Sequence, residues 1–469
     1  MTVGVTDALE IRLHTDESRS IIDVESLVGV ALRRNPKRAH LLVSTVLAKH
    51  VPTVPAVSLA AGELLGLLAS GALDGEPSPA RARDLGRRFA PLVAVLSEGS
   101  GADVESIERA HEALADLRRD ILSAATMRAD VVTLGYAETA TGLGQLVADF
   151  LGSYYLHSTR HSPEGATAFA GFAEEHSHAT DHALLPTDPQ WLRPGGTVVL
   201  VDDELSTGTT VINTITALQT AVPQQHWVVA SLIDLRSPAD RERFVELAES
   251  LDTRISTVSL AAGSIELPTD VLARAAALIE TMPGSRKESG DGVVSMLDCT
   301  DLTPVRSARF GTSDPVNARL AADIASRVAV TVPDADDNRG VLVLGSEEFI
   351  ALAMLTAHEL QQAVAPRSVR FSTSTRSPIA TLDEADYPIA DTIRFRSHDT
   401  TSDGFGERFA YNLTRSGRRF GTVVFMPEPG TDVALLTAAG GALEALRAVT
   451  DTVVVVLLSS SVSTDGTPA

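Results

Sequence analysis

Hydrophobic positions in the first half of the chain form short uninterrupted runs that alternate with helical patterns. The runs of strand length are 131–135, 198–201, 226–234 and 254–260. Apolar residues that recur every three or four positions predict helices over 143–151, 211–218 and 241–251. Repeated strand–helix units with short loops build a parallel sheet with helices on both faces, so the pattern predicts an α/β fold.

A long helical segment precedes these units. Apolar residues recur at three and four over 56–128, and a Pro-rich stretch at 74–82 separates two helices. The segment carries no evident chemistry, and we interpret it as a helical insertion in the first domain. The sequence is expected to hold no membrane span of roughly 18 uncharged apolar residues, since the longest candidate is 453–458.

The second half of the chain echoes the first in the same order. The stretches 341–348, 374–378 and 421–425 parallel 131–138, 158–163 and 196–200. A Pro-, Gly- and charge-rich linker at 281–293 separates the halves, which predicts domains over 1–285 and 286–469. The second copy has no acidic pair, and Pro427 and Pro429 occupy the region of its loop. We infer a second α/β domain that is a degenerate duplicate of the first.

Composition narrows the classes of function. A length of 469 residues suits about three domains, and 44% hydrophobic residues suit a globular core. The single cysteine, Cys299, excludes an internal disulfide framework and fits a reducing compartment, so a cytoplasmic location is expected. The N-terminus has no signal-peptide pattern. A net charge of −22 argues against a nucleic-acid partner, and it means that a polyphosphate ligand needs local cations.

The chemistry gathers after the expected strand at 198–201. Asp202 and Asp203 follow the strand, and a loop of small hydroxyl residues around Gly208 leads into the next helix. Backbone N–H groups and the helix dipole favour a phosphate at such a helix N-terminus. Glycine lets the backbone approach the ligand. The two carboxylates suit the hydroxyls of a diol or a hydrated Mg²⁺ ion. The competing interpretation is an ordinary strand-to-helix turn.

This stretch resembles the phosphoribosyl pyrophosphate (PRPP) signature of type I phosphoribosyltransferases. The resemblance implies that Asp202 and Asp203 are catalytic, bind the ribose hydroxyls and contribute to a magnesium site. It implies that the 5-phosphate is held by Ser206, Thr207, Gly208, Thr209 and Thr210. Some relatives carry an acidic base in this loop. Here the position is Ser206, as in orotate-type enzymes with a hydroxyl residue there, so the sequence does not supply that base.

A second loop resembles the pyrophosphate loop of these enzymes. It follows the strand at 131–135 and includes Gly135, Tyr136, Ala137, Glu138 and Thr139. Arg160, after the next strand, is expected to contact pyrophosphate as a catalytic residue, because a guanidinium fork suits such oxygens. A plain loop is the alternative for 135–142.

Polar residues at 153–186 occupy the place of a mobile hood in related enzymes. The candidate hood or substrate residues are Lys49, His50, His176, His178 and His182. A zinc site, a hood role and a solvated loop remain open for the histidine cluster. A basic cluster at 33–38 is either a solvated turn or a source of cations for the ligand.

The motif Thr375-Arg376-Ser377-Pro378 extends the resemblance to nearly the whole chain. It is similar to two-domain proteins in which a phosphoribosyltransferase-like domain precedes a TRSP domain. That family is associated with bacterial tellurium-resistance and stress operons and with a nucleoside-like metabolite pathway.

The resemblance implies a Mg²⁺-dependent transferase that moves phosphoribosyl from PRPP to a nitrogen heterocycle or related small molecule and releases pyrophosphate. The alternatives are a non-catalytic PRPP or nucleotide regulator and a ribosyl-phosphate hydrolase or phosphorylase. A homodimer or an intramolecular pseudo-dimer of the two halves is expected.

Two further expectations follow from the sequence. Every signature element lies in residues 1 to about 290, so this half is expected to bind PRPP alone. Gly208 is expected to face the phosphate in a surface loop, so Gly208→Val should impair binding far more than stability.

Overall fold

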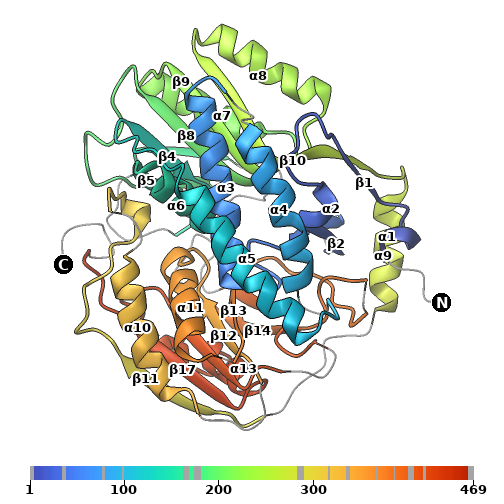
Figure 1. Cartoon of the computed structure of the whole chain (residues 1–469), viewed down its shortest axis with the longest axis vertical. Helices are drawn as coiled ribbons and strands as arrows, with labels where there is room; N and C mark the ends of the chain where they lie inside the picture. Colours follow the sequence, from blue (N-terminus) through green and yellow to red (C-terminus); the bar gives the residue numbers. More distant parts are fainter. Residues whose placement is uncertain are drawn as a thin grey trace.

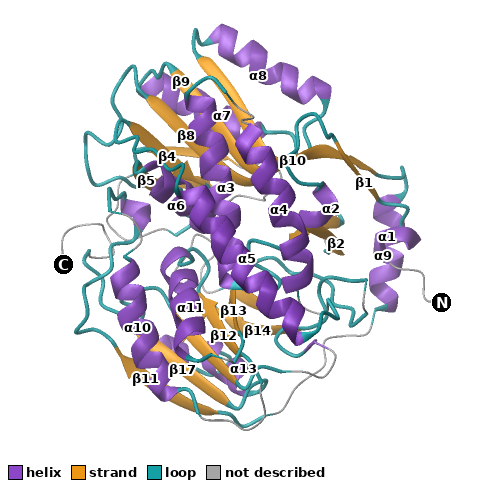
Figure 2. Ribbon diagram, in the orientation of Figure 1, coloured by secondary structure: helices purple, strands orange, loops and turns teal. Residues whose placement is uncertain are grey.

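The computed structural model shows two α/β halves stacked against each other (Figure 1). It describes residues 5–33, 38–76, 80–97, 100–161, 168–173, 181–282, 290–314, 317–333, 339–365, 367–384, 386–399, 406–415 and 419–462. The green strands of the first half lie above the orange and red strands of the second, with long helices running along both (Figures 1 and 2). The predicted boundary near residue 285 falls outside the described residues and stays a prediction.

A six-stranded sheet forms the core of the first half, in the order β1-β10-β9-β8-β4-β5. Its strands are β1 (Arg12–Thr15), β4 (Val131–Gly135), β5 (Tyr154–His157), β8 (Thr197–Leu205), β9 (His226–Asp234) and β10 (Arg254–Glu266). All pair in parallel except β1, which lies antiparallel on β10. The predicted parallel sheet is confirmed. Strand β8 is longer than expected and includes the two acidic residues.

Helices cover this sheet as the alternating pattern predicted. They are α6 (Ala140–Leu151), α7 (Thr209–Ala221) and α8 (Pro238–Ser250), while α9 (Val271–Thr281), which was not predicted, lies beside α1 (Val5–Ala8) (Figure 1). The start of α8 is fixed by a reciprocal capping box, in which the Ser237 side chain accepts from the Asp240 N–H and Asp240 accepts from the Ser237 N–H. Short elements precede the sheet: α1, α2 (Val24–Leu27) and a hairpin of β2 (Val28–Leu32) and β3 (His40–Ser44).

The helical segment consists of α3 (Pro55–Leu73), α4 (Ala80–Leu96) and α5 (Val104–Leu122). Helix α3 packs on α6 and on strands β9 and β10, so it is central to the core. Its mean hydropathy of 1.6 over an 18-residue window makes it long and apolar enough to cross a membrane, which corrects the sequence expectation. That window is 83% buried, as befits a helix that is apolar all round and lies inside a protein.

The second half repeats this architecture with a five-stranded parallel sheet in the order β11-β17-β16-β12-β13. The strands are β11 (Val293–Asp298), β12 (Val341–Gly345), β13 (Val369–Thr373), β16 (Thr422–Met426) and β17 (Thr452–Leu457). Strands β12, β13, β16 and β17 take the places of β4, β5, β8 and β9. Strand β11 takes the place of β10 but comes first in its half, so the duplicate has a rearranged edge strand.

The remaining elements of the second half lie around its sheet, except the short helix η1, which packs on β5 of the first half. They are η1 (Ala308–Phe310), α10 (Ala318–Thr331), α11 (Ala351–Ala363), α12 (Val433–Thr437), α13 (Ala442–Arg447) and the hairpin of β14 (Thr392–Arg396) and β15 (Glu407–Tyr411). A hairpin of β6 (Ala170–Ala173) and β7 (Asp181–Leu184) is its counterpart in the first half.

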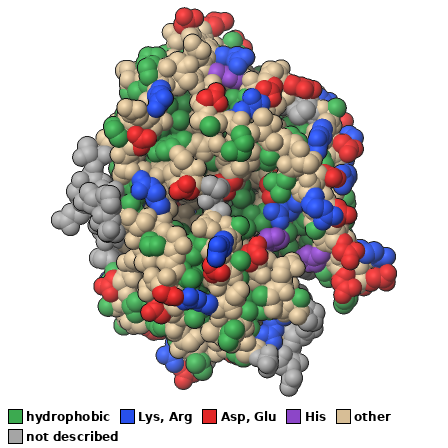
Figure 3. Space-filling model, turned by 60° about the vertical axis from the view of Figure 1, so that its left-hand side comes forward, with side chains coloured by type: hydrophobic (Ala, Val, Ile, Leu, Met, Phe, Trp, Pro, Cys, Tyr) green, Lys and Arg blue, Asp and Glu red, His purple; other side chains and the backbone are tan. Residues whose placement is uncertain are grey.

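The halves meet over a continuous interface. Helix α11 contacts α3 and α6, and isolated bridges join Arg33 to Ile379 and Thr53 to Phe371. Acidic and basic side chains are intermingled over the surface seen in Figure 3. Attraction for an anionic ligand therefore depends on cations placed at its site.

The contact between α3 and α6 yields a stability prediction. A Cβ at Gly62 would lie 2.5 Å from Leu146 Cβ. We expect Gly62→Ala to lower the free energy of unfolding by about 1–3 kcal/mol through overpacking. Helix propensity alone would raise it by about 1 kcal/mol. Urea unfolding measures the sign of the change. A stabilised single variant would contradict the close approach.

Candidate active site

A cavity of about 370 Å³ opens at the carboxyl ends of β4 and β8. The carboxyl edge of a parallel sheet is where α/β proteins bind ligands. The cavity wall brings together Arg33, Arg38, Leu41, Leu42, Lys49, His50, Tyr136, Ala137, Glu138, Thr139, Arg160, His182, Asp202, Asp203, Glu204, Leu205, Ser206, Thr207, Gly208, Thr209, Thr210, Val211, Thr375, Arg376, Ser377 and Pro378. The structure thus gathers the candidate residues among those described, Gly135 excepted, around one space.

The acidic pair lies within the last residues of β8, which corrects the expected strand end at residue 201. Asp202 still pairs across the sheet with Ser231 of β9. The Asp203 N–H donates to the Asp202 carboxylate at 2.9 Å, and both side chains are half-buried. Glu204 accepts from Arg38 Nη2 at 2.5 Å. Arg38, from the basic cluster at 33–38, therefore lies in the cavity wall and pairs with Glu204.

The small-residue loop joins β8 to the N-terminus of α7, as predicted. Thr207 Oγ1 accepts from the Thr209 N–H at 3.3 Å and lies 3.0 Å from Thr209 Oγ1. Hydroxyls and N–H groups of this loop border the cavity at a helix N-terminus, which is the geometry of an anion site.

Gly208 is required for a different reason than expected. Its φ of +76° lies in the left-handed region that favours glycine. A Cβ there would lie 2.6 Å from the ring of Phe244, which is buried on α8. A valine would therefore collide with the protein core, so Gly208→Val costs stability and does not isolate phosphate binding. The expectation of a surface-facing position was wrong.

The loop after β4 is held firmly in place. The Tyr136 N–H donates to the Val201 carbonyl at 3.1 Å, and the Ala137 N–H donates to Ser158 Oγ at 2.9 Å. These bonds tie the loop to both neighbouring strands. Gly135 ends β4, and a Cβ there would lie 2.5 Å from the Tyr155 hydroxyl. Close packing therefore explains the glycine without any ligand.

Glu138 is the electrostatic centre of the cavity wall. It is buried, with Lys49 Nζ 3.7 Å from its carboxylate. Burial raises the pKa of this carboxyl, but Lys49, Arg160, Arg376 and a hydrogen bond from Thr375 outweigh burial and lower the pKa below its ordinary value. Lys49 also donates to Thr139 Oγ1 at 2.5 Å. Glu138 is therefore a carboxylate at neutral pH, compensated from both halves of the chain.

The second half supplies one wall of the cavity through residues 375–378. This arrangement is reciprocal. Thr375 donates to Glu138, and Thr159 Oγ1 of the first half donates to Glu348 of the second at 2.7 Å. The Arg160 N–H also donates to Glu348, at 2.9 Å. The cavity wall is therefore not confined to residues 1 to about 290. That this half binds PRPP alone stays a prediction.

The histidines fall into two groups. His182 lines the cavity, and its Nδ1 lies 2.9 Å from Ser158 Oγ. His50 is buried in the cavity wall, and burial together with Lys49 and Arg33 lowers its pKa well below the ordinary value, so the ring is neutral. His176 and His178 lie outside the described residues, so the hood remains a prediction there.

Sequence reasoning missed two contributions. Glu204 was not singled out, although it extends the acidic pair of β8. The motif at 375–378 served to mark a family and a duplication, but it was not named as part of the site. Arg376 reaches the cavity only because the halves pack against each other, and no local pattern encodes that contact.

Fold and cavity together define an α/β enzyme that binds its ligand at the carboxyl edge of a parallel sheet. The profile of the family described as "Phosphoribosyl transferase" matches residues 27–264, just over half of the chain. A second profile, "TRSP domain C terminus to PRTase_2", matches residues 306–446. The chain belongs to the phosphoribosyl transferase family and carries the TRSP domain. It is a phosphoribosyltransferase, and therefore a pentosyltransferase.

Solved structures that match part of the chain include several adenine phosphoribosyltransferases. The Leishmania donovani protein is 17% identical, with a TM-score of 0.24, over 34% of this chain and 69% of that one. The Giardia lamblia protein, complexed with 9-deazaadenine, is 21% identical with a TM-score of 0.22, over 34% and 85%. The Trypanosoma brucei protein, in complex with AMP, pyrophosphate and ribose-5-phosphate, is 13% identical with a TM-score of 0.22, over 34% and 69%. No curated protein matches the chain significantly.

The compensation of Glu138 yields a pH prediction. A carboxyl whose pKa is lowered on folding stabilises the protein above its ordinary pKa of 4.5 and loses that contribution as the pH falls through the lower folded value. We expect Glu138→Gln to lose stability less steeply than the wild type as the pH drops from about 6 to 3. Each pKa unit of lowering corresponds to about 1.4 kcal/mol. Urea unfolding across this range measures the two slopes, and identical slopes would contradict the compensated carboxylate.

Proposed function

We propose that this chain transfers the phosphoribosyl group of PRPP to a nitrogen heterocycle, with magnesium as cofactor and pyrophosphate as the second product. The observation that carries the proposal is the convergence of three stretches on one cavity: the loop 136–139, Arg160, and the acid-and-hydroxyl stretch 202–210. These are the elements that bear the PRPP resemblance. Membership of the family makes phosphoribosyl transfer the reaction class.

The roles follow from the position of each group. The loop from Ser206 to Thr210 binds the 5-phosphate at the N-terminus of α7, where N–H groups and the dipole favour an anion. Asp202 and Asp203 accept hydrogen bonds from the ribose hydroxyls. Because these acids precede the loop on the same strand, ribose and 5-phosphate bind to adjacent residues.

Pyrophosphate binds on the other side of the cavity. The loop at 136–139 offers backbone groups, and Lys49, Arg160 and Arg376 supply positive charge beside it. Glu138 lies among these cations and fixes their positions. Arg376 comes from the second half, so the two halves act as an intramolecular pseudo-dimer that completes one site.

The residues present suit magnesium. Asp202 and Asp203 present carboxylate oxygens to the cavity, and Mg²⁺ prefers oxygen ligands together with water and substrate phosphates. The ion, when bound, neutralises negative charge on the pyrophosphate. The cavity otherwise combines four acidic with five Lys and Arg side chains, so its own cations do not balance PRPP.

The reaction breaks the bond between the anomeric carbon and the pyrophosphate oxygen, which leaves with the electron pair. A ring nitrogen of the acceptor forms the new bond to that carbon and releases its proton. The chain contributes by positioning both partners and by stabilising charge on the leaving group. The neutral His50 ring is placed to hydrogen bond with the acceptor. Its Nε2 has no hydrogen-bond partner among the described residues.

Calorimetry with PRPP and Mg²⁺ tests the proposal on the full-length protein. We expect Asp202→Asn with Asp203→Asn to weaken PRPP binding by about a hundredfold or more, because each lost charge-assisted hydrogen bond is worth about 1.5–3 kcal/mol. The matched control, Glu242→Gln with Glu246→Gln on the exposed face of α8, removes the same charge and should bind as the wild type does.

A screen of nucleobases and related heterocycles for pyrophosphate release then tests turnover. Release with one acceptor class would identify the substrate. PRPP binding without release for any acceptor would favour a regulator, and ribose-5-phosphate production from water would favour a hydrolase. Absence of PRPP binding in the wild type would overturn the proposal.

A further inference from the structure

Because the two halves are duplicates, the second half has a position equivalent to the PRPP cavity, at the carboxyl ends of β12 and β16. In the first half, the loop after β4 faces residues 375–378 of the second half. In the second half, the loop after β12 faces residues 158–161 of the first, as the hydrogen bonds from Thr159 and Arg160 to Glu348 show. No phosphate loop follows β16, where Pro427, Glu428 and Pro429 stand instead. This equivalent position therefore has different chemistry.

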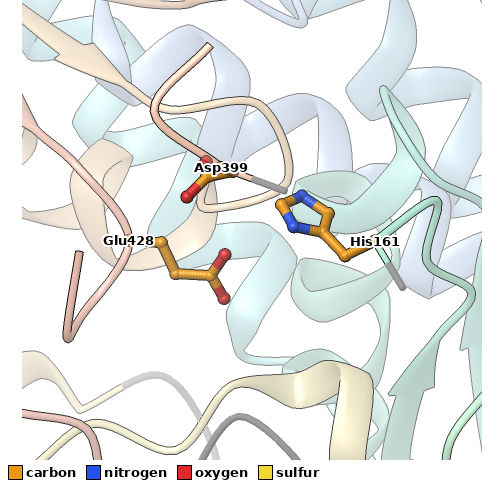
Figure 4. A group of neighbouring side chains, drawn as sticks. All are labelled: His161, Asp399 and Glu428. Carbon is orange, nitrogen blue, oxygen red and sulfur yellow. The ribbon is translucent and has the colours of Figure 1, made fainter. Parts of the chain in front are cut away.

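Three side chains from separate elements point toward one another there (Figure 4). His161 follows β5, Asp399 follows β14, and Glu428 follows β16. One ligand atom from each lies within 4.8 Å of those of the other two. His161 is only 7% exposed, and its Nε2 has no hydrogen-bond partner among the described residues. A buried imidazole nitrogen therefore faces two carboxylates without a hydrogen bond among the described residues, and its ion-pair contact, Glu348 Oε2, lies 3.9 Å away.

The surrounding ion pairs leave Asp399 without an arginine or lysine in direct contact among the described residues. Arg376 and Arg408 bind Glu347 at 3.1 and 2.5 Å. Arg309 lies 2.6 Å from Glu428 and 3.3 Å from Glu348.

Among the described residues, no arginine or lysine pairs with Asp399, whose ion-pair contact is His398 Nε2 at 3.4 Å. A buried carboxylate normally requires a cation. The Asp399 carboxylate, which lacks such a cation, lies near the His161 ring.

We propose that His161, Asp399 and Glu428 bind a divalent transition-metal ion such as Zn²⁺ or Mn²⁺. An imidazole with two carboxylates is a donor set for such ions, whereas Mg²⁺ prefers oxygen alone. Ligand atoms at about 2.1 Å from a tetrahedral ion lie roughly 3.4 Å apart, so binding would draw the three side chains inward. Arg309 then holds Glu428 in place as an outer hydrogen-bond donor.

The site has a consequence for the PRPP cavity, and this part rests on the proposed function. His161 is adjacent to Arg160, whose side chain lines that cavity and whose N–H is bound to Glu348. Metal binding at His161 therefore fixes the loop that carries one of the pyrophosphate-binding cations.

Full-length protein treated with a chelator and then titrated with Zn²⁺ and with Mn²⁺ tests the site without any substrate. We expect one equivalent bound in the micromolar range or tighter, with a melting temperature that rises with metal concentration. His161→Asn and Asp399→Asn should each weaken that binding at least about tenfold. Two histidine controls, His226→Gln on β9 and His182→Asn in the PRPP cavity, should bind metal as the wild type does.

Several outcomes would overturn the site. No binding of either metal to the wild type would overturn the proposed site. Binding unchanged in both His161→Asn and Asp399→Asn, or lost in His182→Asn alone, would place the metal elsewhere. Should one variant fail to fold by circular dichroism, the other decides, because His161 and Asp399 lie on different elements. If the wild type binds metal but not PRPP, the proposed function fails while the metal site stands.

Discussion

The buried carboxylate of Glu138 constrains the whole arrangement. A charged group out of water needs compensation nearby, and the cost of leaving it alone is several kcal/mol. Lys49, Arg160 and Arg376 provide this compensation from three distant parts of the sequence. The ion network therefore holds the N-terminal hairpin region, the loop after β5 and the second half around one cavity. The same cations are the groups that a pyrophosphate needs, so the requirement of folding coincides with that of binding.

Duplication explains why the second half reaches the site. Each half places a Ser-Thr-Arg loop after its second core strand, and each loop binds a glutamate of the other half. These reciprocal contacts give the PRPP cavity and the site around His161 the same backbone arrangement, but their side chains differ. One retains two acids and a hydroxyl loop on β8. The other lacks them and gathers imidazole and carboxylate groups around β16. An internal duplicate can thus keep its structural contacts while its chemistry changes.

Much of the fold was predictable because local patterns determine it. The apolar runs predicted β4 and β9, and the apolar periodicity over 211–218 predicted α7, which begins two residues earlier, at Thr209. The predicted strand at 198–201 was too short because the apolar run ends there, whereas backbone pairing with β9 continues to Leu205. The core position of α3 and the exchanged edge strand β11 depend on packing between distant segments. The neighbour of Gly208, Phe244, lies 36 positions further along the chain and was not visible from the loop itself.

The central claim is that one site is shared by both halves, and PRPP affinity of an Arg376→Gln variant tests it most directly. Arg396→Gln is the matched control, since Arg396 is an exposed arginine of the same half outside the cavity. Both variants are compared with the wild type by calorimetry with Mg²⁺, after unfolding curves establish that each is folded. The account predicts a tenfold to hundredfold loss for Arg376→Gln, as about 1.5–3 kcal/mol of charge-assisted binding disappears, and no change for the control. Equal PRPP affinity in a folded Arg376→Gln variant and the wild type would contradict the shared site.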